Sequence, residues 1–267
     1  MEKADKRNKI TRLREDIYQV NGEKPSSHTY LVRGSDKNML IDTGTTGNFP
    51  NLSECLGEIG LKIEDIHFIL LTHEHSDHTG ATPFFINSAV VCAHRLAANK
   101  IELVDEFVTM TKYLNTPEKD FYAHIWLEDS MFIDLGNYKF KIIHTPGHTS
   151  GCICIYETKE GFLFSGDTVF ANGILSDIAS SGNISDYVNS MEKLNTMKIS
   201  ELYPGHGRIS HSPEQDIDQA VINARTMMEE SKILFEALAK KTGTPPLLRA
   251  FLRKGKNKTA GESDGKK

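Results

Sequence analysis

The first third of the chain shows the alternation of apolar and polar residues that predicts strands. Three short apolar stretches come first, with polar turns between them, and this is typical of strands joined by tight connections. They are residues 16–20, 28–34 and 38–44. From 48 to 60 the apolar spacing lengthens to the i, i+3, i+7 pattern of a helix, with Gly60 as its expected C-terminal cap. The continuous apolar run at 66–72 then predicts a strand buried on both faces.

The remaining two thirds of the chain mix predicted strands with predicted helices. A strand at 89–94 is followed by an insertion at 95–124, for which we expect a largely helical structure broken at Pro117. Strands resume at 131–136, 138–145, 152–157 and 161–168, and helices are expected at 185–197 and 213–240. This order suits a layered arrangement of sheets and helices better than a regular alternation of strand and helix.

Composition and charge narrow the class of protein. With 267 residues, of which 39% are hydrophobic and 25% charged, the chain has the proportions of one large globular domain. The formal net charge of -5 argues against a broad nucleic-acid-binding face, although local basic patches stay open. No apolar run approaches the roughly 20 residues of a membrane span, and the N-terminus lacks the apolar core of a signal peptide. We therefore expect a cytoplasmic protein with a small-molecule substrate and no membrane partner. The sequence leaves open whether the protein forms a homodimer.

The domain boundaries follow from the same patterns. We expect a flexible N-terminus at 1–14, a single folded domain at 15–240, and a basic, disordered tail at 241–267, because the tail has almost no apolar residues. Of the four cysteines, Cys152 and Cys154 alternate within a predicted strand and are interpreted as buried core residues. These boundaries place all of the candidate chemistry in one domain.

The densest chemistry lies in the stretch HEHSDHTG (73–80), directly behind an apolar run. In an extended segment His73 and His75 point the same way, so their spacing can place two imidazoles on one metal ion. Asp77 and His78 follow where the chain must turn, and they could serve a second ion. A zinc-protease motif of the His-Glu-x-x-His type does not fit, because the second histidine falls one place too late.

Three later stretches repeat this construction, with a polar residue at the tip of an apolar strand or in a glycine-bounded turn. They contribute His148, Asp167 and His206. Glycines flank each of these residues, and glycine allows the backbone to approach a crowded site closely. Together with the first motif, they make seven candidate metal ligands.

In these residues the chain resembles the metallo-β-lactamase-fold hydrolase superfamily. The signature of that family is His-x-His-x-Asp-His, then a histidine, a bridging aspartate and a final histidine, and this sequence matches it in order. The matching residues are His73, His75, Asp77, His78, His148, Asp167 and His206. The resemblance covers about residues 15–230 and implies an α+β fold, a four-layer αββα sandwich with a binuclear metal site at one edge.

The resemblance also implies a role for each residue. By analogy, one ion is held by His73, His75 and His148, the other by Asp77, His78 and His206, and Asp167 bridges the two ions, between which a hydroxide is held. Asp42 matches an upstream acidic motif that supports the site without binding metal. Two zinc ions are expected, with iron or manganese as alternatives that these ligand types allow. Asp77 is also expected to orient the hydroxide or to handle its proton, whereas Glu74 is assigned no role.

The implied function is hydrolysis of a thioester or another ester by the hydroxide held between the metals. The stretches around His148 and Asp167 look most like the thioesterase branch typified by hydroxyacylglutathione hydrolase, or glyoxalase II. A lactonase is disfavoured because Phe170 stands where lactonases carry a catalytic tyrosine, and an endoribonuclease or phosphodiesterase is disfavoured by the acidic charge. A mononuclear-iron persulfide dioxygenase is the alternative from another class, and the full ligand set favours hydrolysis over it. Substrate-binding residues stay unknown.

The insertion 95–124 interrupts the range 15–230 and does not itself share the resemblance. It follows His94, is expected to emerge beside the candidate ligands, and carries apolar side chains such as Phe107 and Tyr113. We interpret it as a candidate lid over an acyl chain. The alternative is an amphipathic helix that packs on the sheet or on another subunit.

Overall fold

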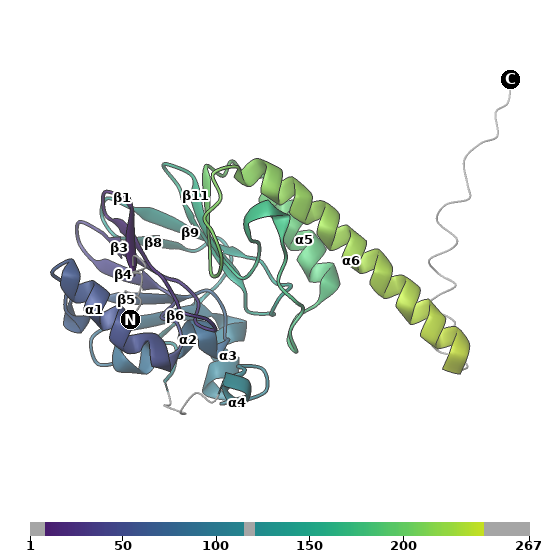
Figure 1. Ribbon diagram of the computed structural model, residues 1–267, viewed down its shortest axis with the longest axis horizontal. Helices are drawn as coiled ribbons and strands as arrows, with labels where there is room; N and C mark the ends of the chain where they lie inside the picture. Colours follow the sequence, from purple (N-terminus) through teal and green to yellow (C-terminus); the bar gives the residue numbers. More distant parts are fainter. Residues whose placement is uncertain (1–8, 115–120, 243–267) are drawn as a thin grey trace, which may run out of the picture. The chain divides into compact units, whose positions relative to one another are not determined.

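The computed structural model describes residues 9–114 and 121–242, with side chains up to residue 238 (Figure 1). The chain divides after Arg225 into two units, and the first contains every strand of the described residues. The tail predicted at 241–267 lies almost entirely outside the described residues, as do residues 1–8 of the segment predicted to be flexible.

One sheet has seven strands that lie side by side in chain order. They are β1 (Ile10–Arg14), β2 (Ile17–Val20), β3 (Thr29–Arg33), β4 (Asn38–Ile41), β5 (Phe68–Leu71), β6 (Val90–His94) and β7 (Ile125–Leu127). Strands β1 to β4 pair antiparallel and β4 to β7 pair parallel, so the carboxyl ends of the last four strands share one edge. The strands predicted at 16–20, 28–34, 38–44, 66–72 and 89–94 are confirmed.

The two outermost strands of this sheet differ from the sequence-based expectation. The domain boundary predicted at residue 15 is wrong, because β1 begins at Ile10, which pairs with Val20 of β2. The residues of β1 are largely polar and only partly buried, so this edge strand shows little apolar alternation. Strand β7 was not predicted either, since it is only three residues long and leaves Ile125 and Trp126 exposed.

The second sheet has five strands, in the order β12-β11-β10-β9-β8. They are β8 (Phe132–Asp134), β9 (Lys139–His144), β10 (Ile153–Glu157), β11 (Phe162–Gly166) and β12 (Glu201–Pro204). All pairs are antiparallel except β11 with β12, which is parallel. The strands predicted at 131–136, 138–145, 152–157 and 161–168 are confirmed, and Cys152 and Cys154 are buried free thiols as expected.

Helices cover the outer faces of the two sheets. The helices and 3₁₀ turns are η1 (Thr46–Asn48), α1 (Phe49–Glu58), η2 (Ile63–Asp65), α2 (Ser76–Thr79), η3 (Thr82–Phe84), α3 (Arg95–Glu102), α4 (Thr111–Leu114), η4 (Ala171–Gly173), α5 (Ile184–Asn195) and α6 (Pro213–Thr242). Helices α1 and α3 pack on the seven-stranded sheet through residues such as Leu56 and Ala97, while Leu70 and Phe164 belong to the core between the sheets. Helix α5 lies beside the five-stranded sheet, on the face that is turned away from the seven-stranded sheet (Figure 1).

This arrangement confirms the predicted αββα sandwich. The helices predicted at 48–60, 185–197 and 213–240 are confirmed as α1, α5 and α6. Within the described chain, no helix combines the length and the apolar character that crossing a membrane requires.

The insertion 95–124 is helical only in two short pieces, α3 and α4. Between them, Val104 and Met110 adopt left-handed backbone conformations, with φ of 48° and 62°, which an α-helix cannot contain. The prediction of a largely helical insertion is therefore wrong for the segment between the two helices. The predicted break at Pro117 falls in residues 115–120, outside the described chain.

The two sheets meet closely at the edge where the candidate ligands lie. Thr72, the residue after β5, accepts a backbone hydrogen bond from Ile153 N at 2.9 Å, and this bond joins the sheets. Gly166, the last residue of β11, has a φ of +50°, and a Cβ atom there would lie 2.7 Å from Thr72 Cβ. The close approach therefore depends on glycine. It brings the carboxyl end of β5 next to those of β11 and β12.

Candidate metal centre

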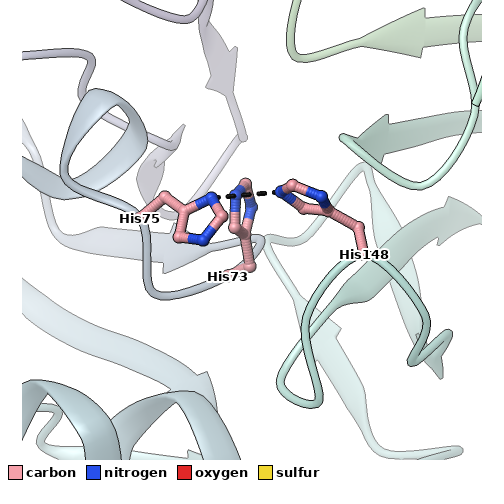
Figure 2. Close-up of side chains that lie close together, drawn as sticks. All are labelled: His73, His75 and His148. Atoms are coloured by element: carbon pink, nitrogen blue, oxygen red, sulfur yellow. Dashed lines mark hydrogen bonds between the residues drawn. The ribbon is translucent and has the colours of Figure 1, made fainter. Parts of the chain in front are cut away.

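Three histidines from two loops form the first part of the site. His73 and His75 follow β5, and His148 lies in the loop between β9 and β10. All three side chains are buried, and their ligand nitrogens lie within 4.8 Å of one another. His75 Nδ1 lies 3.1 Å from His148 Nε2. Figure 2 shows these two side chains facing each other, with the ring of His73 beside them. We call His73, His75 and His148 the three-histidine group.

A second group adjoins the first and contains a carboxylate. Asp77 and His78 belong to α2, and His206 follows β12. Their ligand atoms also lie within 4.8 Å of one another, with His206 Nε2 3.1 Å from Asp77 Oδ2. His78 is fully buried, whereas the side chains of Asp77 and His206 are 17% and 31% exposed. We call Asp77, His78 and His206 the mixed group.

Asp167 lies between the two groups. Its Oδ1 is 3.2 Å from His78 Nε2, and its Oδ2 is 3.8 Å from His206 Nε2 and 4.0 Å from His148 Nε2. With His73 and His78 it forms a third set of ligand atoms within 4.8 Å. One carboxylate therefore reaches both groups, and all seven residues singled out in the sequence come together at one place.

Several polar atoms of this cluster have no hydrogen-bond partner. Among the described residues, His73 Nε2, His75 Nε2, His78 Nε2 and Asp167 Oδ1 are buried and make no hydrogen bond, although the last two atoms lie 3.2 Å apart. Buried polar atoms nearly always have a partner, so four exceptions in one cluster need an explanation. Imidazole nitrogens and carboxylate oxygens are ligands that divalent transition metals take. The donor set therefore fits such ions, and these His/Asp groups could bind them.

Comparison with known proteins identifies the family. The model of the metallo-beta-lactamase superfamily matches residues 23–206, a range that includes all seven candidate ligands. The chain belongs to this superfamily. The resemblance seen in the sequence is thereby confirmed.

Relatives within the superfamily carry names of hydrolases. A probable metallo-hydrolase of Methanocaldococcus jannaschii is 36% identical over 203 residues, which make up 72% of this chain and 93% of that protein. The human acyl-coenzyme A thioesterase MBLAC2 is 31% identical over 209 residues, or 67% of this chain and 72% of that protein. The prediction of a superfamily metallo-hydrolase is confirmed at this level.

Solved structures share the fold. A metallo-beta-lactamase family protein of Thermus thermophilus superposes with a TM-score of 0.69 at 23% identity, covering 82% of each chain. The subclass B3 metallo-beta-lactamase BJP-1 of Bradyrhizobium japonicum superposes with a TM-score of 0.65 at 21% identity, covering 88% of this chain and 95% of that enzyme. At these identities the matches speak for the metallo-beta-lactamase fold and not for a shared substrate.

A buried carboxylate behind the superfamily motif fixes two of the imidazole rings. Asp42 accepts hydrogen bonds from His78 Nδ1 at 2.7 Å, from Thr72 N at 2.8 Å and from Thr72 Oγ1 at 2.7 Å. Because the Thr72 hydroxyl donates to Asp42, it can only accept from His73 Nδ1, which is 3.1 Å away. Both rings therefore donate a hydrogen bond from Nδ1 and turn Nε2 toward the other candidate ligands. Asp42 thus stands behind the ligands, in the supporting position that the sequence predicts for it.

A backbone carbonyl orients His148 in the same way. His148 Nδ1 donates to Asp177 O, so that Nε2 faces the cluster. Asp177 belongs to the segment 174–183, in which Ala179 N also donates to His148 O at 2.9 Å. The position of His148 therefore depends on a segment that follows Asp167 in the chain.

The imidazoles and carboxylates shift one another's pKa in opposite directions. Burial and the neighbouring histidines lower the pKa of His73, and burial above all lowers the pKa of His75 to about 3. Burial also opposes the protonation of His78, but the surrounding carboxylates outweigh it and raise its pKa well above the usual value. Burial likewise opposes the ionisation of Asp167, yet the imidazoles beside it lower its pKa. His73 and His75 are thus neutral, whereas Asp167 carries its charge.

Of the residues that support the site, the sequence predicts Asp42 but not Thr72, Asp177 or Glu74. Thr72 stands in the same stretch as His73, but nothing in the residue pattern shows that its hydroxyl reaches Asp42. The Asp177 carbonyl is a backbone atom, which no motif can mark. Glu74, to which the sequence assigns no role, is fully buried, and burial raises its pKa against the effect of two hydroxyl hydrogen bonds.

Proposed function

We propose that the protein is a binuclear metal hydrolase that cleaves acyl thioesters. The observation that carries this proposal is the convergence of seven candidate ligands in three overlapping groups. The relative MBLAC2, an acyl-coenzyme A thioesterase, supports a thioester as the substrate. In this proposal the three-histidine group and the mixed group hold one ion each, Asp167 joins them, and zinc is the metal, with iron or manganese as alternatives.

Each residue around the ions has a definable task. Divalent ions held by these residues would lower the pKa of bound water to about 7 and would polarise a carbonyl oxygen. Asp167 sets the separation of the two groups, because its carboxylate reaches His148 on one side and His206 on the other. Asp77 stays ionised, since the imidazoles of His78 and His206 lower its pKa although burial opposes this. We assign to Asp77 the orientation of the attacking water and the acceptance of its proton.

The leaving group favours a thioester over a lactone. A thiol has a pKa of about 8.5, so a thiolate departs near neutral pH with little help, whereas an alkoxide needs a proton from an acid. Phe170 cannot donate one. The buried hydroxyl of Tyr187 is already committed, because it donates to Thr168 O at 2.8 Å and accepts from Ser176 N at 3.0 Å. These two positions near Asp167 therefore supply no acid for lactone opening.

The described part of the insertion around Thr109 is the proposed contact surface for the acyl group. Ser76, which stands between two candidate ligands, donates its N–H to Thr109 O at 2.8 Å and so fixes the insertion beside the site. The rings of Phe107 and Tyr113 flank Thr109 in the chain, lie 6.0 Å apart and are largely exposed. Exposed apolar side chains beside a site often mark a ligand surface. The role of a lid, predicted from the sequence, is kept as part of this proposal.

A substrate panel on the zinc-loaded protein tests the proposal. The panel contains acyl-coenzyme A and glutathione thioesters, a lactone, a phosphodiester and a short RNA, with an oxygen electrode run in parallel. We expect release of free thiol from at least one thioester, at a rate that exceeds turnover of the other classes by about tenfold or more. Faster turnover of the lactone, the phosphodiester or the RNA would contradict the thioesterase proposal. Oxygen consumption by a protein with one iron per chain would favour a persulfide dioxygenase instead.

The same panel also shows whether the thiol part of the substrate is coenzyme A or glutathione, because it contains thioesters of both.

The cytoplasmic location, the small-molecule partner and the homodimer stay predictions of the sequence.

A further inference from the structure

Glu74 lies between two candidate ligands in the chain, but its carboxylate is bound elsewhere. Its Oε2 accepts a hydrogen bond from the Thr149 hydroxyl and its Oε1 accepts one from the Ser181 hydroxyl, both at 2.8 Å. The side chain is fully buried. Burying a carboxylate on neutral hydroxyl partners costs stability, which points to a role in the site rather than in the fold.

The two partners of Glu74 belong to the segments that hold His148. Thr149 directly follows His148, and Ser181 belongs to 174–183, the segment that binds the His148 ring. The Ser181 hydroxyl also accepts a hydrogen bond from Ser150 N at 3.2 Å. One carboxylate thus joins the first histidine motif to both of the segments that set the position of His148.

The space around the carboxylate is closed by close packing. A Cβ atom at Gly151 would lie 2.7 Å from Glu74 Oε2 and 2.6 Å from Ala97 Cβ, so only glycine fits there without a shift of its neighbours. Ala97 belongs to α3, the first helix of the insertion. The carboxylate is therefore confined between α3 and the loop of His148 and has little freedom to find other partners.

We propose that Glu74 is a positioning residue that holds His148 at the distance from His73 and His75 that binding of a metal ion requires. This inference rests on the proposed metal site, and it assigns Glu74 no contact with the ion or the substrate. The physical reason is that three ligands from two loops bind one ion tightly only if the loops are held together before the ion arrives. Without the carboxylate, the loop of His148 keeps its link to Asp177 and the contact between the His148 and His75 rings, but it loses the two hydrogen bonds through which Glu74 ties both segments to the first motif.

Two substitutions at position 74 separate positioning from simple occupation of space. Glu74→Leu removes both acceptors, and we expect the ion of the three-histidine group to bind about 10–100-fold more weakly, the range found when groups behind metal ligands are removed. Glu74→Gln keeps one acceptor oxygen and adds a donor that the second hydroxyl can accept, so we expect affinity within a few-fold of the wild type. The ion of the mixed group should bind equally well in both variants.

Glu157 offers a matched control. It is a second buried glutamate, it accepts hydrogen bonds from Lys159 N and Glu160 N, and it lies at the opposite end of β10 from the site. Glu157→Leu reports what the loss of a buried carboxylate does to the fold alone. We expect it to lower the melting temperature of the metal-free protein without weakening either ion.

The measurement is titration of the metal-free full chain with cobalt(II), in competition with a chelator. The visible absorption of cobalt reports the geometry of its ligands, and no substrate is needed. The inference holds if Glu74→Leu weakens one of two ions and changes its spectrum while Glu157→Leu does neither. It is overturned if Glu74→Leu binds both ions like the wild type, or if Glu157→Leu weakens them as much.

A second pair of variants covers the case in which Glu74→Leu does not fold. Thr149→Val and Ser181→Ala each remove one hydroxyl partner and keep the carboxylate. We expect each to weaken the same ion by a few-fold and the double variant to weaken it more; a double variant with wild-type affinity overturns the inference. Failure of the proposed function is distinguishable, because a wild-type chain that binds two cobalt ions but cleaves no thioester leaves the role of Glu74 intact.

Discussion

The three-histidine group and the mixed group differ in exposure and in charge. His73, His75 and His148 are 0%, 3% and 7% exposed, whereas the side chains of Asp77 and His206 are 17% and 31% exposed. The three-histidine group contains imidazoles only, and the mixed group contains a carboxylate. In the proposed function this difference becomes a division of tasks, in which the three-histidine group is the enclosed anchor and the mixed group is the face that water and substrate reach.

The supports of the two groups also differ. Asp42 binds His78 directly and His73 through Thr72, so it acts on both groups. His148 depends instead on the backbone of 174–183 and on the bonds of Glu74 to its neighbours. Variants of these supports can therefore disturb both groups or one group alone.

The largest effect is expected from Asp167→Asn, because the carboxylate of Asp167 lies within 4.0 Å of His148 in one group and of His206 in the other. The substitution keeps the shape of the side chain and removes its charge. We expect turnover to fall by more than about 10³-fold, with loss of at least one ion per chain. Steady-state kinetics and elemental analysis of the same sample check this. Two retained ions with turnover within tenfold of the wild type would show that Asp167 does not join the groups.

Asp77→Asn tests whether the mixed group does more than hold an ion. We expect turnover to fall by about 10²–10³-fold while the ion of the three-histidine group is retained, because a neutral amide cannot accept a proton from the attacking water. The readouts are kcat and the number of ions per chain. Full metal content together with full turnover in this variant would contradict the role assigned to Asp77.

Asp42→Asn should disturb both groups together, to a smaller extent. The backbone of Asp42 has a φ of 56°, a conformation that asparagine tolerates, so the substitution adds little strain. An amide nitrogen in place of Asp42 Oδ2 accepts a hydrogen bond from neither His78 Nδ1 nor Thr72 Oγ1. We therefore expect metal affinity to fall about 10–100-fold in both groups. Thr72→Val is the matched variant, expected to weaken the three-histidine group more. Equal metal affinity in Asp42→Asn and the wild type contradicts the orienting role of Asp42.

The smallest effect concerns the insertion, which contacts the ligand loop but supplies no ligand. We expect the double substitution Phe107→Ser, Tyr113→Ser to lower kcat/KM for long-chain acyl thioesters by about 5–10-fold and to leave acetyl thioesters unchanged. Phe132→Ser is the control, since Phe132 is an exposed aromatic residue of β8 in the other sheet. An equal loss of kcat/KM for short and long acyl chains would contradict the proposed contact between the insertion and the acyl group.

The convergence of the candidate ligands was predictable because each stands beside a strong local pattern. His73, His75 and Asp77 follow the apolar run of β5, and His148, Asp167 and His206 stand in short glycine-bounded turns. Parallel pairing of β4 to β7, and of β11 with β12, then brings the carboxyl ends of the strands together, which a single motif does not encode.

Apart from Asp42, the supports could not be predicted, because they depend on residues that are distant in the chain. Ser181 and Glu74 are separated by 107 positions, and no periodicity links them. The edge strands β1 and β7 were missed since little of their surface is buried. The sequence predicts a longer helix in the insertion than the structure has, because apolar spacing does not reveal the left-handed residues Val104 and Met110.

The number of metal ions per chain tests the two-group site most directly. Metal-loaded wild-type protein, His148→Ala and His206→Ala are freed of excess metal and analysed by mass spectrometry for metal and by absorbance for protein. We expect two ions per chain in the wild type and one in each variant, with different cobalt spectra for the remaining ion, because each substitution empties a different group. One ion per wild-type chain, or the same remaining spectrum in both variants, would contradict the division of the site into two metal-binding groups.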